Sequence, residues 1–282
     1  MLCLVLVSLV WAFSFGLTKG NLVGLDSAFI SAARLSLALL VFLPFLRLRG
    51  LSVATGFKLT AIGAVQFGLM YLALNESYRY LQAYEVVLFT ITTPILVTLF
   101  ADALDRTFRW RALAAAVLAV LGAAFIAYRS AELKLTLTGV VLVQLSNAAF
   151  ALGQVAYRRL RQRETALRDR DVFGLLYLGA SVLTLAVMFT RVDITTLSLT
   201  TKQLWTLLYL GVLASGLCFF LWNVGATQVG SGTLAVMNNA KAPLGVACSL
   251  LFFGETAPLL PLIASLCVFG LAVWLARSRP TT

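Results

Sequence analysis

Residues 232–253 read GTLAVMNNAKAPLGVACSLLFF, an apolar stretch with one lysine, Lys241, near its middle. At about 1.5 Å per residue along a helix, Lys241 lies roughly 14 Å into this stretch, near the centre of a hydrocarbon core about 30 Å thick. A charge at that depth is unfavourable by several kcal/mol unless it has a partner or a water-filled cavity. The stretch therefore predicts a transmembrane helix with a polar site at its centre.

Nine other apolar segments accompany it, each about as long as a helix that spans a bilayer. Hydrophobic residues make up 61% of the chain and charged residues 12%, whereas charged residues alone are about 25% of a soluble domain. The composition excludes a soluble protein, and the expected fold class is an all-α integral membrane protein with ten transmembrane helices. The other nine predicted spans are 2–19, 28–46, 59–79, 84–103, 112–128, 138–157, 173–190, 204–225 and 258–276.

The net charge of +11 reflects 22 Lys and Arg residues against 11 Asp and Glu. A basic chain can bind nucleic acid, but here the basic residues follow the membrane topology. With the N-terminus inside, fourteen of them fall in cytoplasmic segments and six on the other side, and the positive-inside rule then places both termini in the cytoplasm. We expect a multi-pass protein of the inner membrane with no nucleic-acid partner. The first span has no basic n-region and is expected to remain as a helix.

The residue types exclude most catalytic and metal-binding sites. The chain has no histidine, which removes Ser-His-Asp and Cys-His nucleophiles and His-ligated zinc. Its four cysteines lie within apolar segments and show no metal-ligand spacing. We therefore expect no enzyme, no metal and no cofactor.

Two spans carry a proline at matching positions, which indicates an internal repeat. Pro94 lies eleven residues after Ala83, and Pro243 lies eleven residues after Gly232. Because five helices, an odd number, separate the two copies, the second copy must be inverted in the membrane. Inverted repeats with broken or proline-bearing helices are typical of secondary transporters that alternate access between two faces, although prolines are common in transmembrane helices generally. The prediction is two inverted five-helix repeats around a central cavity.

Charged residues within and beside the spans are the first candidate site residues. Asn238 precedes Lys241 by three positions and shares its face; a lysine in a cavity suits an anionic or zwitterionic group, and the alternative is a structural lysine held by carbonyls or an acid. Arg34, roughly 10 Å inside the outer end of the second span, could hold a carboxylate bidentately. Its alternative is an ion pair with Glu76 or Glu85, near the outer ends of the third and fourth spans.

Amides and aromatic residues complete the candidate set. Amides within a membrane face protein or water rather than lipid, either as substrate ligands or as interhelix hydrogen bonds, and aromatic residues wall a pocket or pack in the core. The fifth and tenth spans have almost no polar side chains and are expected at the periphery. The amides are Gln66 on the third span and Gln144, Asn147 and Gln154 on one face of the sixth; the aromatic residues are Trp11 on the first span and Trp222 on the eighth.

Four short stretches occur in a recognisable order: WAFSF from Trp11, SAARLSLA from Ser31, SYRYLQA from Ser77 and FFGE from Phe252. In this order they resemble the EamA-type members of the drug/metabolite transporter superfamily, and the likeness extends along the whole chain. It implies ten helices in two inverted five-helix units, 1–128 and 137–276, a cavity lined by helices other than the fifth and tenth, and transport of small metabolites. The chain departs from the family pattern at Asp105-Arg106, where a Gly-Glu pair is usual, and at Lys241, which marks substrate choice.

These observations predict a secondary transporter that moves a small organic metabolite with a negative or zwitterionic head, such as an amino acid or a carboxylate. Lys241 would be the counter-charge and a candidate site for proton coupling, since desolvation lowers the pKa of a lysine. Export is the direction expected from the resemblance, by a monomer or homodimer in the lipid bilayer. One alternative is an exporter of cationic or lipophilic drugs, favoured if Glu85 faces the cavity and a partner neutralises Lys241. The others are a channel and a membrane-embedded enzyme. A channel needs a continuous polar path, whereas the polar residues here gather at mid-membrane.

Overall fold

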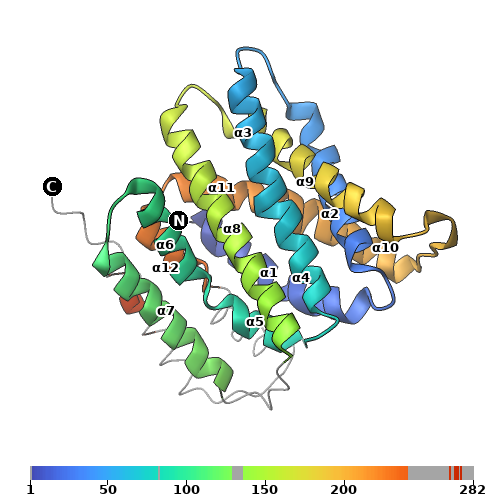
Figure 1. Ribbon diagram of the computed structural model, residues 1–282, viewed down its shortest axis with the longest axis horizontal. Coiled ribbons are helices and arrows are strands. Elements are labelled where there is room, and N and C mark those ends of the chain that lie inside the picture. Colours follow the sequence, from blue (N-terminus) through green and yellow to red (C-terminus); the bar gives the residue numbers. More distant parts are fainter. Residues whose placement is uncertain are drawn as a thin grey trace.

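The computed structural model describes residues 2–81, 83–128 and 136–240, together with 267, 270–272 and 274. These described ranges are helical and contain no β-strand. Figure 1 shows the helices packed side by side in one bundle. In chain order the elements are α1 (Leu2–Asn21), α2 (Ser27–Phe42), η1 (Leu43–Phe45), α3 (Val53–Gly63), η2 (Ala64–Leu69), α4 (Met70–Ser77), α5 (Ala83–Thr90), α6 (Thr93–Asp105), α7 (Trp110–Tyr128), α8 (Leu137–Arg163), α9 (Asp169–Arg191), η3 (Ile194–Thr196), α10 (Thr201–Leu208), η4 (Tyr209–Leu217), α11 (Cys218–Thr227) and α12 (Ser231–Met237).

Six helical segments of the described chain are long and apolar enough to cross a membrane. Each overlaps one predicted span, and α8 and α9 extend past the predicted limits because their charged ends continue the helix into the polar region, where no lipid limits helix length. The tenth predicted span and most of the ninth lie outside the described residues. The six segments are Leu2–Asn21, Ser27–Phe45, Val53–Ser77, Leu137–Arg163, Asp169–Arg191 and Thr201–Thr227.

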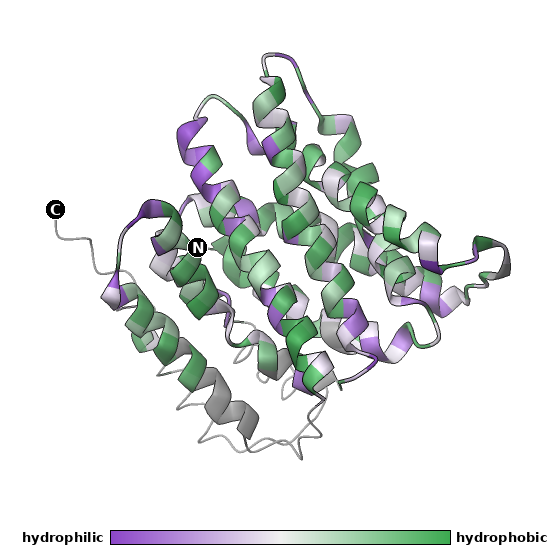
Figure 2. Ribbon diagram, viewed as in Figure 1, coloured by the Kyte–Doolittle hydropathy of each residue, from purple (hydrophilic) through white to green (hydrophobic). Residues whose placement is uncertain are grey.

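The bundle has two ends with different charge. Figure 2 shows hydrophilic residues gathered at the helix ends and hydrophobic residues along their flanks. At one end, which we name the basic end, lie the connections 46–52, 106–109, 164–168 and 228–230, with most of the described Lys and Arg residues. At the other, which we name the vestibule end, lie the connections 22–26, 78–81 and 192–200.

The predicted span 84–103 is broken rather than continuous. It forms α5 and α6, separated by a turn at Ile91 and Thr92 directly before Pro94, which occupies the first turn of α6. Proline lacks a backbone N–H and its ring clashes with the carbonyl four residues earlier, here that of Thr90, so the helix cannot continue through it. The sequence indicated a proline-bearing helix, and the structure adds that the helix stops there.

Two spans contain π-helical segments at mid-length. η2 lies between α3 and α4, and η4 lies between α10 and α11. A π-helical turn contains an extra residue, which shifts the hydrogen-bond ladder and frees backbone carbonyls for other donors; such segments occur frequently at functional sites. The two spans involved are the predicted third and eighth, which occupy the same position in the two predicted repeats.

α9 packs between α2 and α3, and two glycines set its distance from α3. A Cβ atom on Gly179 would lie 1.9 Å from the Thr60 carbonyl oxygen, and one on Gly63 would lie 1.9 Å from the carbonyl oxygen of Leu176. Only glycine allows backbones to approach so closely, the small-residue contact that is common between membrane helices.

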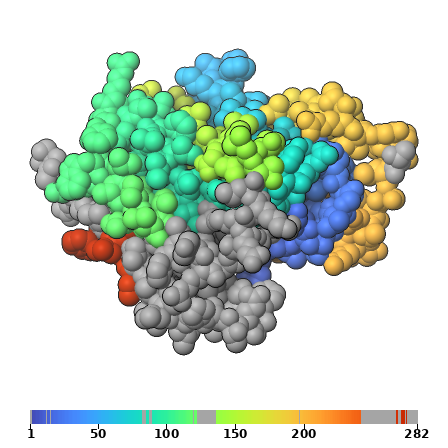
Figure 3. Space-filling view, turned by 60° about the horizontal axis from the view of Figure 1, so that its bottom comes forward, coloured from blue at the N-terminus to red at the C-terminus, as the bar shows by residue number. Residues whose placement is uncertain are grey.

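α7 lies at the edge of the bundle, where it packs against α6 and α12. In the view of Figure 3, α7 occupies one flank and α9 and α10 the opposite flank. This is the peripheral position predicted for the fifth span.

Candidate functional site

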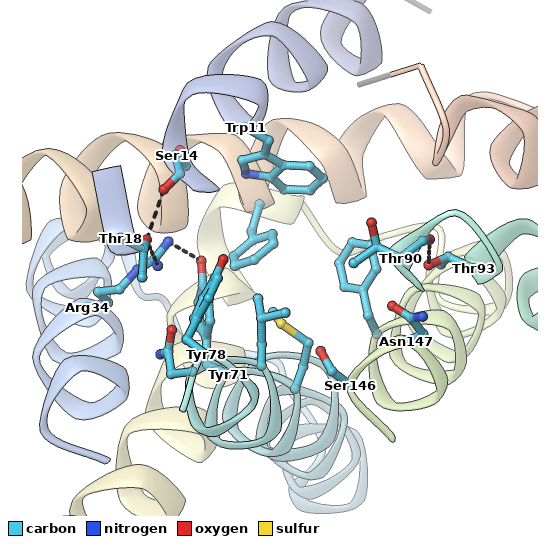
Figure 4. A pocket seen from close by; sticks show the side chains of 15 residues that line it. Trp11, Ser14, Thr18, Arg34, Tyr71, Tyr78, Thr90, Thr93, Ser146 and Asn147 are labelled. Carbon is cyan, nitrogen blue, oxygen red and sulfur yellow. Dashed lines mark hydrogen bonds between the residues drawn. The ribbon is translucent and has the colours of Figure 1, made fainter. Parts of the chain in front are cut away.

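A cavity lies inside the bundle, in the half nearer the vestibule end, where α1, α2, α4, α8 and α11 converge. About 610 Å³ of space between the atoms lies there, a figure that includes open solvent at the mouth of the cavity. Figure 4 shows polar side chains at two opposite ends of this cavity and aromatic side chains between them. The described residues that line it are Trp11, Ser14, Thr18, Arg34, Met70, Tyr71, Leu74, Asn75, Tyr78, Thr90, Thr93, Ser146, Asn147, Phe150 and Phe219.

Arg34 of α2 occupies one end of the cavity (Figure 4) and is 3% exposed. Its guanidinium donates from Nε to Ser215 Oγ at 3.1 Å, from Nη2 to Tyr71 Oη at 2.5 Å and from Nη1 to Thr18 Oγ1 at a longer 3.4 Å. It also lies 4.2 Å from the centroid of the Tyr71 ring. Within the described residues, no carboxylate is at ion-pair distance from Arg34. The cavity therefore contains a buried positive charge that neutral hydroxyl groups solvate.

The two acids considered as partners of Arg34 lie elsewhere. Glu76 accepts a hydrogen bond from Arg79 at 2.9 Å and lies 3.5 Å from Arg191. Glu85 is buried on α5, at 2% exposure, and is not among the described residues that line the cavity. The ion pair of Arg34 with Glu76 or Glu85 is therefore not formed, and the carboxylate-binding interpretation of Arg34 is retained.

The π-helical segment η4 builds the wall beside Arg34. Its shifted hydrogen-bond ladder leaves carbonyls that accept from side chains of other helices. Trp11 Nε1 donates to the Ala214 carbonyl at 2.9 Å, and the Tyr177 hydroxyl donates to the Ser215 carbonyl at 2.7 Å. The Ser215 hydroxyl in turn accepts from Arg34. One irregular segment thus fixes both Trp11 at the cavity floor and a partner of the buried charge.

Neutral polar groups occupy the opposite end of the cavity, where Figure 4 shows Thr90, Thr93 and Asn147. The break between α5 and α6 interrupts the helical hydrogen bonding there, and the Phe89 carbonyl accepts from Asn147 Nδ2 at 2.9 Å. Asn147 Nδ2 also lies 3.2 Å from Thr92 Oγ1. The broken helix thereby fixes the orientation of Asn147.

A network of buried amides lies below the cavity floor, toward the basic end. Gln66 Nε2 donates to Asn223 Oδ1 at 3.1 Å. Trp222 Nε1 donates to Gln154 Oε1 at 2.8 Å, and Gln154 Nε2 donates to Asn238 Oδ1 at 3.3 Å. Gln66, Trp222 and Asn238 were predicted to contact substrate, but they are not among the described residues that line the cavity. In this conformation they join helices through hydrogen bonds, the alternative that the sequence left open for the amides.

An aromatic cluster closes the bundle between the cavity and the basic end. We name it the aromatic seal. Its members are at most 4% exposed. The ring centroids of neighbouring members lie 4.6 to 6.1 Å apart in stacked, tilted and edge-on contacts. Such contacts stabilise aromatic pairs beyond the burial of their area. The seal consists of Phe42, Phe67, Tyr71, Phe173, Tyr177 and Phe219.

Access to the cavity comes from the vestibule end. A second, larger hollow of about 1060 Å³ there is lined by Lys19, Asp26 and Arg79, among others. It shares Thr18, Asn75 and Tyr78 with the cavity. Among the described residues, the cavity is therefore open toward the vestibule end and closed toward the basic end.

Lys241 and Pro243 lie outside the described residues. The last described residues before them, 238–240, form a turn after α12. In this turn Asn239 Nδ2 donates to the Ile91 carbonyl at 2.8 Å, beside the break between α5 and α6. The predicted role of Lys241 in cargo recognition stays a prediction from the sequence.

Tyr71 and Ser146, which line the cavity, and Ser215, which accepts from Arg34, were not predicted from the sequence. Serine is too common in membrane helices to give a signal alone, but Tyr71, Asn75 and Tyr78 recur at offsets of four and seven, which places them on one face of a helix. That polar face was the available signal. Across the part of the chain that is described, no three His, Cys, Asp or Glu residues are grouped as a metal site.

Comparison with protein families gives one match over nearly the whole chain. The model described as the EamA-like transporter family matches residues 1–128 and 137–277. A crystal structure of a protein only 15% identical in sequence has the same fold, with a TM-score of 0.75 over 97% of this chain and 94% of its own.

Curated relatives are similar over their full lengths. A protein of Pseudomonas aeruginosa named "Probable biotin transporter" is 42% identical over 276 residues, 97% of this chain and 96% of that protein. The protein named "Biotin transporter" of Escherichia coli K12 is 39% identical over 279 residues, 98% of this chain and 93% of that protein. One with the same name in Salmonella typhimurium is 38% identical over 279 residues, with the same coverage.

Proposed function

Because the chain belongs to the EamA-like transporter family, it is a small-metabolite transporter and not an enzyme, and we propose that it carries biotin. Biotin is a monocarboxylate in which a short aliphatic chain joins the carboxylate to a bicyclic urea. The observation that carries the proposal is Arg34, a buried cation that lines the cavity and has only neutral partners among the described residues. A carboxylate is the ligand that such a guanidinium lacks.

The charge of the cavity favours this cargo over the alternatives. Arg34 is the one charged side chain among the fifteen described lining residues, so a cationic drug would be repelled. An amino acid would bring an ammonium group toward the same arginine, whereas biotin has no positive charge. Lys241 is proposed as a second counter-charge, on the sequence argument alone.

The same family membership supports the architecture and the topology proposed from the sequence. Ten helices in two inverted repeats, 1–128 and 137–276, are supported by the two segments of the family match and by π-helical segments in the third and eighth spans. The excess of basic residues at the basic end supports an inner-membrane protein with cytoplasmic termini. The vestibule would then face outward.

Transport by the purified chain in proteoliposomes tests the cargo. We expect saturable transport of radiolabelled biotin that excess unlabelled biotin abolishes and excess leucine leaves unchanged. Vesicles loaded inside or outside measure direction, for which export is the expectation from the resemblance, and an imposed pH gradient measures proton coupling. Transport of labelled leucine without transport of biotin would overturn the proposal.

A further inference from the structure

The two ends of the cavity differ in the hydrogen bonds that they can offer. The Arg34 end is positively charged, whereas the Asn147 end is neutral and polar (Figure 4). We propose that the substrate binds in one fixed direction, with its carboxylate at Arg34 and its urea at Ser146 and Asn147. This inference rests on the proposed function and adds the groups that select the cargo.

Asn147 presents an acceptor to the cavity. Its Nδ2 atom is committed to the Phe89 carbonyl at 2.9 Å and to Thr92 Oγ1 at 3.2 Å, while none of the described residues donates to its Oδ1 atom. Both partners of Nδ2 lie at the break between α5 and α6, so the amide is held with its nitrogen toward that break. The remaining oxygen can accept an N–H from a ligand.

Ser146 presents a hydroxyl beside it. This serine is 3% exposed and lines the cavity, and the described part of the chain supplies no hydrogen bond to its Oγ atom. A hydroxyl group can donate a hydrogen bond as well as accept one, so this group is available to a ligand in the cavity. The pair thus offers one acceptor and one donor side by side.

A urea is complementary to this pair. It has two N–H donors and a carbonyl acceptor, so one N–H can bond to Asn147 Oδ1 while the Ser146 hydroxyl donates to the carbonyl. A carboxylate has no donor for Asn147 Oδ1, and the two oxygens would repel each other. The reverse orientation of biotin would therefore lose the hydrogen bonds at one end and the charge pairing with Arg34 at the other.

The middle of the cavity suits the part of the molecule between these groups. Met70, Leu74, Phe150 and Phe219 line it together with Trp11. Figure 4 places Trp11 across the space between the Arg34 end and the Asn147 end. An apolar surface between two polar ends matches a thioether ring and an aliphatic chain between a urea and a carboxylate.

Competition against labelled biotin uptake in proteoliposomes tests the orientation, with two probes that each lack one group. Biotin methyl ester retains the urea and lacks the anion; lipoate retains the same carboxylate chain on a sulfur-containing ring and lacks the urea. Because Ser146 makes no hydrogen bond with the described chain, Ser146→Ala is the mildest variant. Ser181→Ala is the matched control, a buried serine outside the cavity lining whose hydroxyl is also without a partner.

We expect Ser146→Ala and Asn147→Ala to reduce the preference for biotin over lipoate by about tenfold, the effect of one hydrogen bond, and to leave the preference for biotin over its methyl ester unchanged. Arg34→Met should reduce the preference for biotin over its methyl ester and leave the preference for biotin over lipoate unchanged. Ser181→Ala should change neither preference. Equal weakening of biotin and lipoate by Ser146→Ala would overturn the inference while leaving biotin as cargo. A wild-type chain that does not transport biotin would overturn the proposed function and this inference with it.

Discussion

Replacing Arg34 by methionine separates the function of this arginine from its contribution to stability. Methionine keeps most of the apolar side chain and removes the guanidinium. A bidentate carboxylate makes two hydrogen bonds to a charged group, each stabilising by about 1.5–3 kcal/mol. The longest existing contact, from Nη1 to Thr18 at 3.4 Å, leaves that nitrogen the most available to a ligand. Taking the lower value for each bond, Arg34→Met should weaken biotin binding by about 3 kcal/mol, roughly 100-fold.

The thermal stability of the ligand-free protein should not fall in the Arg34→Met variant. The variant loses three hydrogen bonds to neutral hydroxyls but no longer buries a charge without an anion, a costly state within a membrane. Ser215 and Tyr71 still pair with each other, at 2.9 Å between their hydroxyl oxygens. We therefore expect the thermal unfolding temperature in detergent to be unchanged or higher, as is common when a functional but strained group is removed.

Equilibrium binding of labelled biotin and thermal unfolding, measured on the same purified samples, check both expectations. Lys58→Met, which removes an exposed positive charge of α3, controls for net charge and should change neither quantity. Arg34→Lys should recover only part of the affinity because an ammonium lacks the planar, bidentate geometry. Unchanged biotin affinity in a stable Arg34→Met protein would refute the carboxylate-binding role, and a large loss of stability would make Arg34 a structural residue.

Three further predictions follow from the sequence and the packing. Lys241→Met should abolish biotin binding without loss of thermal stability, and unchanged affinity would remove Lys241 from the set of binding residues. Gly179→Ala should lower the unfolding free energy by about 1–3 kcal/mol, because the added Cβ would lie 1.9 Å from a backbone oxygen of α3. Gly16→Ala is the control: its Cβ would meet nothing within 4 Å, so the substitution should be neutral or stabilising. Equal effects of the two substitutions would contradict the close approach of α3 and α9. Single cysteines at Thr165 and Thr195 should be labelled from the cytoplasm and from outside, respectively, and the reverse result would invert the topology.

The sequence predicted the six long apolar helical segments of the described chain, because bilayer thickness fixes the length of such segments. It placed Arg34 in the first half of the second span, and Arg34 lies in the first half of α2, 3% exposed. The proline at position 94 gave a sequence signal for the break in this span, because proline interrupts a helix. The π-helical segments had no such signal, because the extra residue in each leaves composition and hydropathy unchanged.

The candidate site was only partly predictable, for a geometric reason. Sequence spacing gives the depth of a side chain and the face that it shares, but the rotation of each helix against its neighbours depends on packing. Gln66, Trp222 and Asn238 are therefore buried inside the bundle and yet do not line the cavity. Asn147 and Trp11 were predicted from the same kind of evidence, a polar or aromatic residue within a predicted span, and they do line the cavity.

The aromatic seal determines where the membrane voltage acts. A path of water from the vestibule to the cavity would carry the electrical potential of that side down to the aromatic rings, so that most of the voltage would fall across them. A substrate anion that enters the cavity would then cross little of the field. The same charge would cross most of it, about 2.3 kcal/mol per 100 mV, in a conformational change that separated the rings and opened the cavity to the basic end. The electrical work of transport would therefore be done during the conformational change that separates the rings, and not when the substrate binds.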